Sequence, residues 1–594
     1  MIEELRSAGD QLREAWDNYR QVCSKIDSCI TPEWPQPSDF LAELADQLKI
    51  EMESISSYEL GLPGIKFTVS LALQSLEGET GIAVEGGGGR QNWSGWHRTT
   101  VRPDYSPLSR FFKSLDINAR PPSDTFSGPF PINFLPPEIL TRIFYLLLAQ
   151  PCNLHLLSPD NKTHYPIYPD YLAQVCSHWR EVAISTCSLW CHIDLSAYEP
   201  QYGDLIARAE RHIARAGTLP IELHIADNKD ERYRSMDRDH SNLFELVSRI
   251  SSRVTALEFV TEDLLDFHYE VFMRVLLGRP QNFTKFTTWR GHNYSDALIL
   301  AGSVDPAELD HEFTLFQLNV TEDQIQNCFA PLAVLHLHGL FPYWPSIAYH
   351  GLVDLRLLSR NPRTSIQEGQ FKTILTSSPG LRILHFGLNI CDSAPENVQI
   401  VPVHLPELQV VKIFPNHPLV GVNRCPSKVL RLLAPGMRPL RLSIEDYYIP
   451  DAHLTVEMER FFARSRVARF YTRVVFPPLT LLCQHAAHLE LVVLDGFESY
   501  SQDEIFFQQS DSSELALHPL NSVHVTRSSL SKSNINLLLE SCPDGTVLYS
   551  CNFIRDGRED FSTENVLDIF PSVKVSDDNP YSWGTPTADW DLLD

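Results

Sequence analysis

Five side chains able to bind a metal lie close together in the sequence, namely Cys176, His178, Cys187, Cys191 and His192. Thiolate sulfur and imidazole nitrogen are the ligands of structural zinc sites, where two cysteines are commonly separated by two residues. No such Cys-x2-Cys pair occurs in this stretch, and Cys176 falls on the apolar face of a predicted helix. The spacing therefore favours a structural role for these residues over a zinc site.

Three further patterns that could support catalysis are incomplete. His311-Glu312 lacks the second histidine that would place two zinc ligands on one helix face. The glycine run Gly86–Gly89 is followed by Arg90 and not by the Gly-Lys-Ser/Thr of a phosphate-binding loop, and no Gly-x-Ser-x-Gly elbow is present. The sequence therefore predicts no catalytic residue, no metal ligand and no cofactor.

The composition limits the classes of partner. The 594 residues carry a formal net charge of −26, which argues against nucleic-acid binding and against adhesion to anionic membranes. The longest apolar stretch, Ile143–Ala149, is too short to span a bilayer, and the first residues are charged rather than signal-like. Twelve scattered cysteines suit reduced thiols, so we expect a cytoplasmic or nuclear protein.

Residues 135–190 predict a hairpin of two helices. Pro136 and Pro137 suit the first turn of a helix, and Glu138 there complements the helix dipole. Two adjacent apolar stripes follow, one of Ile139, Ile143 and Leu146 and one of Leu140, Phe144 and Leu147. A second helix is expected from about Asp170 onwards, with apolar residues at helical spacing. One stripe can join the two helices, and the other is left for a partner.

This pattern resembles the F-box, the module through which substrate receptors dock on the Skp adaptor of cullin-type ubiquitin ligases. The matching positions are Leu135, Pro136, Glu138, Ile139, Leu140, Ile143, Phe144, Leu172, Val175, Cys176, Trp179, Arg180, Leu189 and Trp190. A long insertion, residues 149–170, departs from the compact F-box. The resemblance implies that the Skp adaptor binds at Leu135, Pro136, Ile139, Leu140, Ile143, Phe144, Leu172 and Val175. The bland alternative is an ordinary buried hairpin that caps the next domain.

After the hairpin, an apolar-x-x-apolar-x-apolar triplet recurs every 19 to 34 residues. Its copies start at Trp190, Pro220, Val254, Phe313, Leu332, Leu352, Leu381, Leu408, Met437, Leu489 and Leu520, with imperfect copies, ending in Thr, at Phe283 and Val467. Predicted helices precede several copies, for example at Leu243–Ile250 and Phe371–Leu375. The pattern resembles leucine-rich repeats in degenerate form, with the expected Asn met well only at Asn389. Some other array of helices and strands is the alternative, and in either case binding specificity would lie between the strand leucines.

The remaining segments have weaker patterns. Residues 2–30 carry a heptad seam, compatible either with weak self-association or with one amphipathic helix folded on the body. Residues from Arg555 are strongly acidic and end Asp-Trp-Asp-Leu-Leu-Asp, which indicates a solvated tail or a short acidic–aromatic docking motif at Trp590. We expect five parts: helix 1–30, linker 31–130, F-box 131–197, leucine-rich-repeat-like solenoid 198–553 and acidic tail 554–594.

Together these features predict an α/β protein without enzymatic activity of its own. The F-box resemblance implies a non-catalytic ligase subunit that binds the Skp adaptor, and through it a cullin, and presents an unknown protein substrate on the repeats. The alternative is a repeat-containing scaffold that recruits no ligase.

Overall fold

The structure is a computed structural model, and every structural statement below concerns the residues that it describes. These are residues 135–148, 169–196, 202–226, 240–261, 266–278, 280, 282–290, 296–304, 313–395, 400–414, 426–445, 454–473, 476–497, 518–554, 563–576, 587 and 589–591. The predicted heptad helix and linker, and most of the predicted insertion, lie outside them. The chain divides into two compact units, the first reaching Cys191 and including Arg215–Gly217, the second holding the rest.

Unit 1 contains the predicted hairpin. Its elements are α5 (Pro137–Leu148), α6 (Leu172–Val175), α7 (Ser177–Ser185) and the 3-10 turn η4 (Cys187–Trp190). The second helix, expected to be continuous, is instead broken at Cys176, whose backbone is extended (φ −155°, ψ 174°). The Cys176 sulfur accepts a hydrogen bond from the Trp179 amide at 3.4 Å and so caps α7. The helical periodicity of the sequence did not reveal this break, because it does not show that a side chain such as Cys176 can bond to a nearby backbone amide in place of continuing the helix.

Aromatic residues hold unit 1 together. Phe144 of α5 and Trp179 of α7 are both buried, with ring centroids 4.9 Å apart. The Trp190 indole donates to the Ala183 carbonyl at 2.8 Å, and the Arg215 guanidinium lies over its ring at 4.0 Å. The two predicted helices therefore share a small core that is closed by Trp190.

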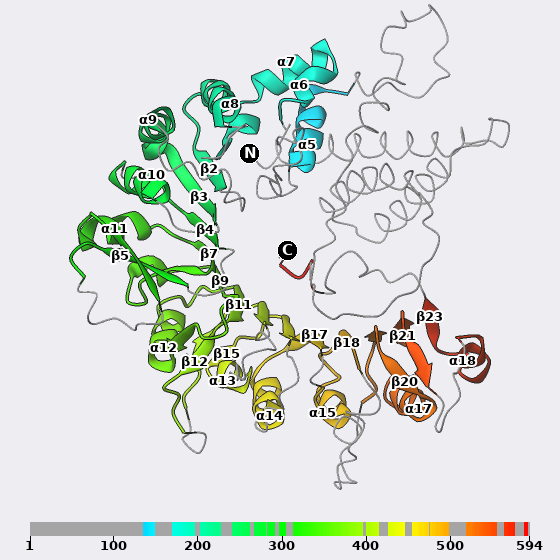
Figure 1. Cartoon of the computed structure of the whole chain (residues 1–594). Coiled ribbons are helices and arrows are strands. Elements are labelled where there is room, and N and C mark those ends of the chain that lie inside the picture. Colours follow the sequence, from blue (N-terminus) through cyan, green and yellow to red (C-terminus); the bar gives the residue numbers. More distant parts are fainter. Residues whose placement is uncertain are drawn as a thin grey trace, which may run out of the picture. The chain divides into compact units, whose positions relative to one another are not determined.

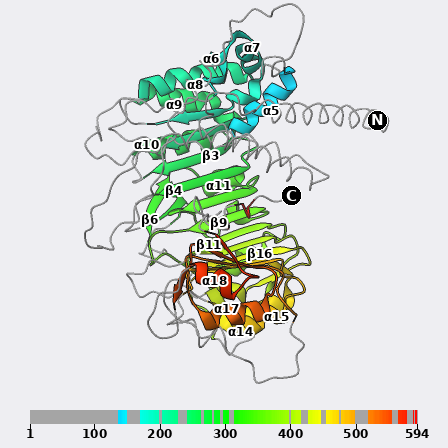
Figure 2. The same cartoon turned by 90° about the vertical axis from the view of Figure 1, so that its right-hand side faces the viewer.

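Unit 2 is built on one long parallel sheet (Figures 1 and 2). In spatial order its fourteen strands are β1 (His192–Leu195), β2 (Ile221–Ala226), β3 (Val254–Thr261), β4 (Lys285–Arg290), β7 (Val334–His338), β9 (Asp354–Leu358), β11 (Ile383–Gly387), β14 (Val410–Ile413), β16 (Leu440–Glu445), β17 (Val467–Arg473), β18 (Leu491–Asp495), β19 (Val523–Thr526), β21 (Thr546–Tyr549) and β23 (Lys574–Ser576).

The described helices of unit 2 all cover one face of this sheet (Figure 1). They are α8 (Tyr202–Ala216), α9 (Ser241–Ile250), α10 (Asp266–Leu277), α11 (Glu322–Phe329), α12 (Glu368–Thr376), α13 (Pro426–Leu430), α14 (Leu454–Arg464), α15 (Leu479–Gln484), α17 (Lys532–Ser541) and α18 (Thr563–Ile569). We call the opposite face the strand face.

Four smaller parallel sheets accompany the long sheet in the described part of the chain. They pair β5 (Ala297–Ala301) with β6 (Thr314–Leu318) and β8 (Leu340–Pro342), β10 (Ser365–Gln367) with β12 (Asn389–Cys391), β13 (Val403–Leu405) with β15 (Leu433–Pro435), and β20 (Ser529–Ser531) with β22 (Asn552–Ile554).

The apolar triplets explain the core. Phe386 of β11 packs on Phe371 of α12, with centroids 4.5 Å apart, and Phe470 of β17 packs on Phe462 of α14 at 5.7 Å. Because side chains alternate along a strand, the residue between the last two apolar positions must point to the strand face. The predicted triplets mark strands of the long sheet in every case but that of Phe313, which leads into β6 of a smaller sheet.

The long sheet extends beyond the predicted boundary at residue 553. Strand β23 pairs with β21, so residues assigned to a solvated acidic tail supply the last strand. Neither strand was predicted. Thr546 interrupts the apolar pattern at β21, whereas Phe570, Val573 and Val575 fit the triplet but lie in the segment assigned to the acidic tail. Within the described residues, no helix is both long and apolar enough to cross a membrane.

Candidate functional site

The two stripes of α5 have different environments. Leu140 and Phe144 are fully buried, whereas Ile139 is 43% exposed and Ile143 is half-buried. One stripe therefore closes the hairpin and the other begins at the surface, as the sequence pattern suggested.

The residues predicted to bind the Skp adaptor are accordingly split. Pro136 is exposed, Leu135 and Val175 are half-buried, and Leu172, like Leu140 and Phe144, is completely buried. The prediction that Leu140, Phe144 and Leu172 lie on an accessible docking surface must be corrected, because they form the buried interior of unit 1, where Phe144 meets Trp179. Five of the eight predicted positions remain at least partly accessible.

The strand register of unit 2 reveals a second candidate site. One residue from each strand lies in a continuous row across the strand face, which we call the central row. The row consists of Asp194, His224, Glu258, Thr287, His336, Arg356, His385, Lys412, Ser443, Tyr471, Val493, His524, Val547 and Lys574. These are the positions between the apolar strand residues, where the sequence placed binding specificity.

Eight central-row residues precede Ser443, and all of them except Thr287 carry a titratable side chain. In the second half of the row, aromatic and apolar side chains such as Tyr471 and Val493 take their place. The strand face thus has a polar half and a more apolar half, and the polar half contains two clusters of contacting side chains.

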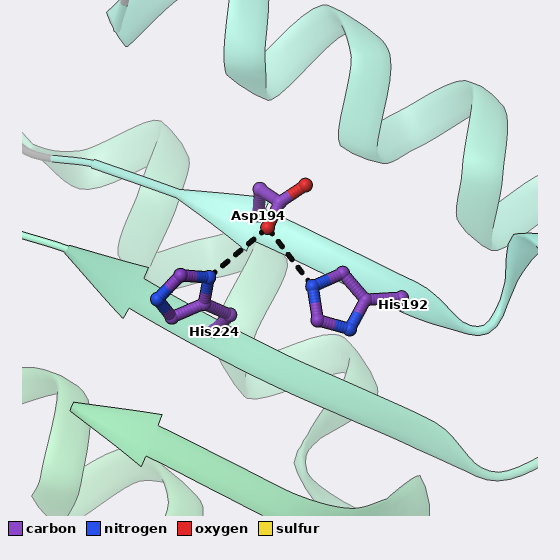
Figure 3. A group of neighbouring side chains, drawn as sticks. All are labelled: His192, Asp194 and His224. Atoms are coloured by element: carbon purple, nitrogen blue, oxygen red, sulfur yellow. Dashed lines mark hydrogen bonds and ion pairs between the residues drawn. The ribbon is translucent and has the colours of Figure 1, made fainter. Parts of the chain in front are cut away.

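The first cluster surrounds Asp194 of β1 (Figure 3). Its Oδ1 atom lies 3.0 Å from Nε2 of His192 and 3.2 Å from Nδ1 of His224, and its Oδ2 atom lies 3.1 Å from Arg208 of α8. Burial alone raises the pKa of Asp194, but the two histidines outweigh that effect and hold it well below its ordinary value. Three donors therefore stabilise one buried carboxylate.

His192, Asp194 and His224 offer two imidazole nitrogens and a carboxylate oxygen within 4.8 Å of one another, which suits a divalent metal ion. However, the Arg208 guanidinium already holds the second oxygen of Asp194, and its fixed positive charge would repel an ion bound to the same carboxylate. The geometry therefore favours a structural hydrogen-bond network over a metal centre.

Of the cysteines and histidines that cluster in the sequence, only His192 belongs to this network. Cys176 caps α7, and Cys187 and Cys191 make long contacts with the backbone within or next to η4. Sequence spacing could not reveal Asp194 and His224 as the partners of His192. Their positions between strand leucines were the available signal.

The second cluster lies in the middle of the central row and contains an acid from far along the chain. The Asp591 carboxylate lies 2.9 Å from Arg356, 3.0 Å from His385 and 2.8 Å from Lys412. Lys412 also donates to the Thr587 carbonyl at 2.7 Å. We call Thr587 and Asp589–Asp591 the docked segment.

Electrostatics favours the ionised form of Asp591. Burial alone raises its pKa, but hydrogen bonds and charge from His385 and Lys412 hold the pKa below its ordinary value. Burial lowers the pKa of His385. Because a carboxylate can only accept, the imidazole donates to Asp591 through Nε2–H over 3.0 Å. Arg356 is itself held by Asp354, through two hydrogen bonds of 3.0 and 2.9 Å.

The neighbouring residue, Trp590, fills an apolar position on the same face. It is 1% exposed and packs with Tyr471, Val493 and Leu491, while its carbonyl accepts from Arg441 at 2.8 Å. The expectation of a solvated tail is therefore wrong at this point, because the indole and the carboxylate are both held by the strand face. The alternative, an acidic–aromatic docking motif at Trp590, agrees with this contact.

Comparisons with known proteins do not assign the chain to a family. No protein-family model matches the chain, and no curated protein matches it.

Proposed function

We propose that the protein is the substrate-recognition subunit of a Skp–cullin–F-box ubiquitin ligase. Unit 1 would bind the Skp adaptor, and the sheet of unit 2 would act as a degenerate leucine-rich-repeat surface for a protein substrate. The observation that carries the proposal is the pair of stripes on α5, with Leu140 and Phe144 buried while Ile139 remains 43% exposed.

The exposed stripe supports a docking role because it is apolar at its start. Pro136 and Ile139 are exposed and Leu135 and Ile143 are half-buried, so a partner can cover a continuous apolar strip on one side of the helix. A hairpin that served only as a cap would bury both stripes.

The proposed mechanism is proximity. A receptor that binds the ligase at one site and the substrate at another raises the effective concentration of the substrate near the charged conjugating enzyme. No residue of this chain needs to contact the bond that forms, which agrees with the expectation of a non-catalytic subunit.

Binding of purified Skp adaptor tests the proposal. Ile139→Glu should abolish binding, because it places a charge in the apolar strip, and the fold should survive because the side chain is exposed. Ile184→Glu is the matched control, since Ile184 is 42% exposed on α7 of the same hairpin. It should bind like the parent.

Adding a cullin to the same pull-down separates a ligase subunit from an adaptor-bound scaffold. Capture of the cullin with the parent chain supports the ligase. Failure of the parent to bind the Skp adaptor, or equal binding by the parent and by Ile139→Glu, contradicts the proposal.

A further inference from the structure

We propose that the strand face of unit 2 carries a binding site for a peptide with an aromatic residue directly followed by an acidic one, and that Trp590–Asp591 occupies this site in cis. A partner that presents the same two side chains in the same order would compete with the docked segment.

The acidic half of the site is specific for a carboxylate. Arg356, His385 and Lys412 come from three adjacent strands, β9, β11 and β14, and converge on one side chain. The chain as a whole is strongly negative, so the positive charges of Arg356 and Lys412 make this part of the strand face unlike the average surface. Charge-assisted hydrogen bonds of this kind are stronger than neutral ones.

Lys412 shows most clearly that the site is built for an acid. It is 5% exposed, and its ammonium contacts in the described structure are both with the docked segment, at the Asp591 carboxylate and the Thr587 carbonyl. A buried ammonium without an anion would be costly, so this position requires either an acidic occupant or water.

The aromatic half of the site lies on β17 and β18, two and three strands beyond β14, which carries Lys412. Tyr471 and Val493, adjacent in the register of β17 and β18, pack on the indole together with Leu491. Tyr471 is fixed by donating to Asp495 at 2.8 Å, so the surface is formed before an aromatic ring arrives. Arg441 donates to the Trp590 carbonyl, which any peptide residue at that position would also supply.

These contacts explain why order matters. The carboxylate site and the aromatic site are held apart by the spacing of the strands. Asp589, the acid before the ring, is exposed, whereas Asp591, the acid after it, reaches Lys412. The peptide must also be extended enough for a carbonyl to reach Lys412, as that of Thr587 does.

The docked segment should compete with an external peptide because it is covalently attached to the chain that carries the site. A segment tethered to its site acts at an effective concentration in the millimolar range, so an external peptide binds the intact chain weakly. If unit 2 presents substrates as proposed above, this site defines their class; that consequence rests on the proposed function, whereas peptide binding itself does not.

Fluorescence anisotropy with a labelled peptide of residues 585–594 provides the test, in the absence of the Skp adaptor. The full chain carrying Trp590→Ala and Asp591→Asn should bind the peptide at least tenfold more tightly than the parent chain does. Adding Lys412→Met to that variant should reduce its affinity at least tenfold, and raising the salt concentration should weaken binding.

Two controls make the result specific. Lys574→Met removes an exposed lysine from β23 in the same central row and should leave affinity unchanged. A peptide in which the Trp-Asp order is reversed should bind at least tenfold more weakly than the native order.

Equal binding by the parent and by the open variant, or equal binding of the two peptide orders, would overturn the proposal. So would loss of the circular-dichroism signal in the open variant, because the docked segment would then be an integral part of the fold. A positive result here with no binding of the Skp adaptor would retain the peptide site and reject the ligase.

Discussion

The Asp194 carboxylate accepts a hydrogen bond from His224, its direct partner in the parallel register of β1 and β2, over 3.2 Å. Both side chains are 1% exposed. The first two strands of the sheet are thus joined on the strand face by polar contacts, while buried apolar pairs such as Leu195 and Ile225 join them on the helix face. Cross-strand pairs of this kind are a unit of sheet stabilisation.

Replacing Asp194 by Asn should destabilise unit 2 by about 3–5 kcal/mol, because the buried Arg208 guanidinium would lose the negative charge of a carboxylate that lies 3.1 Å away. Urea unfolding followed by circular dichroism measures this loss. Glu210→Gln serves as the control, since its side chain on α8 is 47% exposed and pairs with the exposed Arg249, and should change the free energy by less than about 1 kcal/mol. A loss below that value for Asp194→Asn would show that the network contributes little.

Zinc should not raise the melting temperature of the chain, and EDTA should not lower it. The reason is that Arg208 already occupies the carboxylate that a metal ion would need. Differential scanning calorimetry with and without zinc checks this. A zinc-dependent rise that disappears in His224→Ala would identify the His192–Asp194–His224 group as a metal site after all.

Acidification should remove the stabilisation that Asp354 provides. Burial alone would raise the pKa of Asp354, but hydrogen bonds from His336 and Arg356 lower it to about 2, from 3.8. Since the pKa is lower in the folded state, the contribution is complete above pH 4 and is lost as the pH falls towards 2. It amounts to roughly 2 kcal/mol.

Urea unfolding of the parent and of Asp354→Asn between pH 5 and pH 2 measures this contribution. The gap between their unfolding free energies should narrow across that interval. A gap that stays constant would mean that the carboxylate titrates alike in the folded and unfolded chain.

Gly545→Ala should destabilise the C-terminal strands by several kcal/mol. A Cβ at this position would lie 2.0 Å from the Asn521 backbone oxygen, so the turn before β21 would have to move away from the turn before β19. Gly369→Ala is the matched control, because nothing lies within 4 Å of its Cβ and the residue sits in α12. It should be neutral or stabilising by up to about 1 kcal/mol. Thermal melts of the two variants should therefore shift in different directions or by clearly different amounts.

Local patterns made the repeated strands predictable, since alternating apolar residues specify both the strand and its buried face. Leu384 and Phe386 are buried as expected, and His385 between them points to the strand face. The break at Cys176 was not predictable in this way, because it depends on one side chain capping a backbone amide.

The docked segment was beyond the reach of local patterns. Asp591 and His385 are 206 residues apart, and nothing in the acidic sequence around Trp590 states which strands will hold it. For unit 1, helical periodicity separated the two stripes of α5 correctly. The burial of Leu172 was not predictable in the same way. It depends on the packing of α6, a helix of four residues whose ends the sequence did not indicate.

The docked segment is synthesised after every strand that it contacts. Thr587 follows Lys412 by 175 residues, which a ribosome takes roughly 10–35 s to translate. If the repeats fold as they emerge, each new molecule passes through an interval in which the cations of the strand face are formed and uncovered. A partner present at the ribosome would meet no internal competitor during that interval.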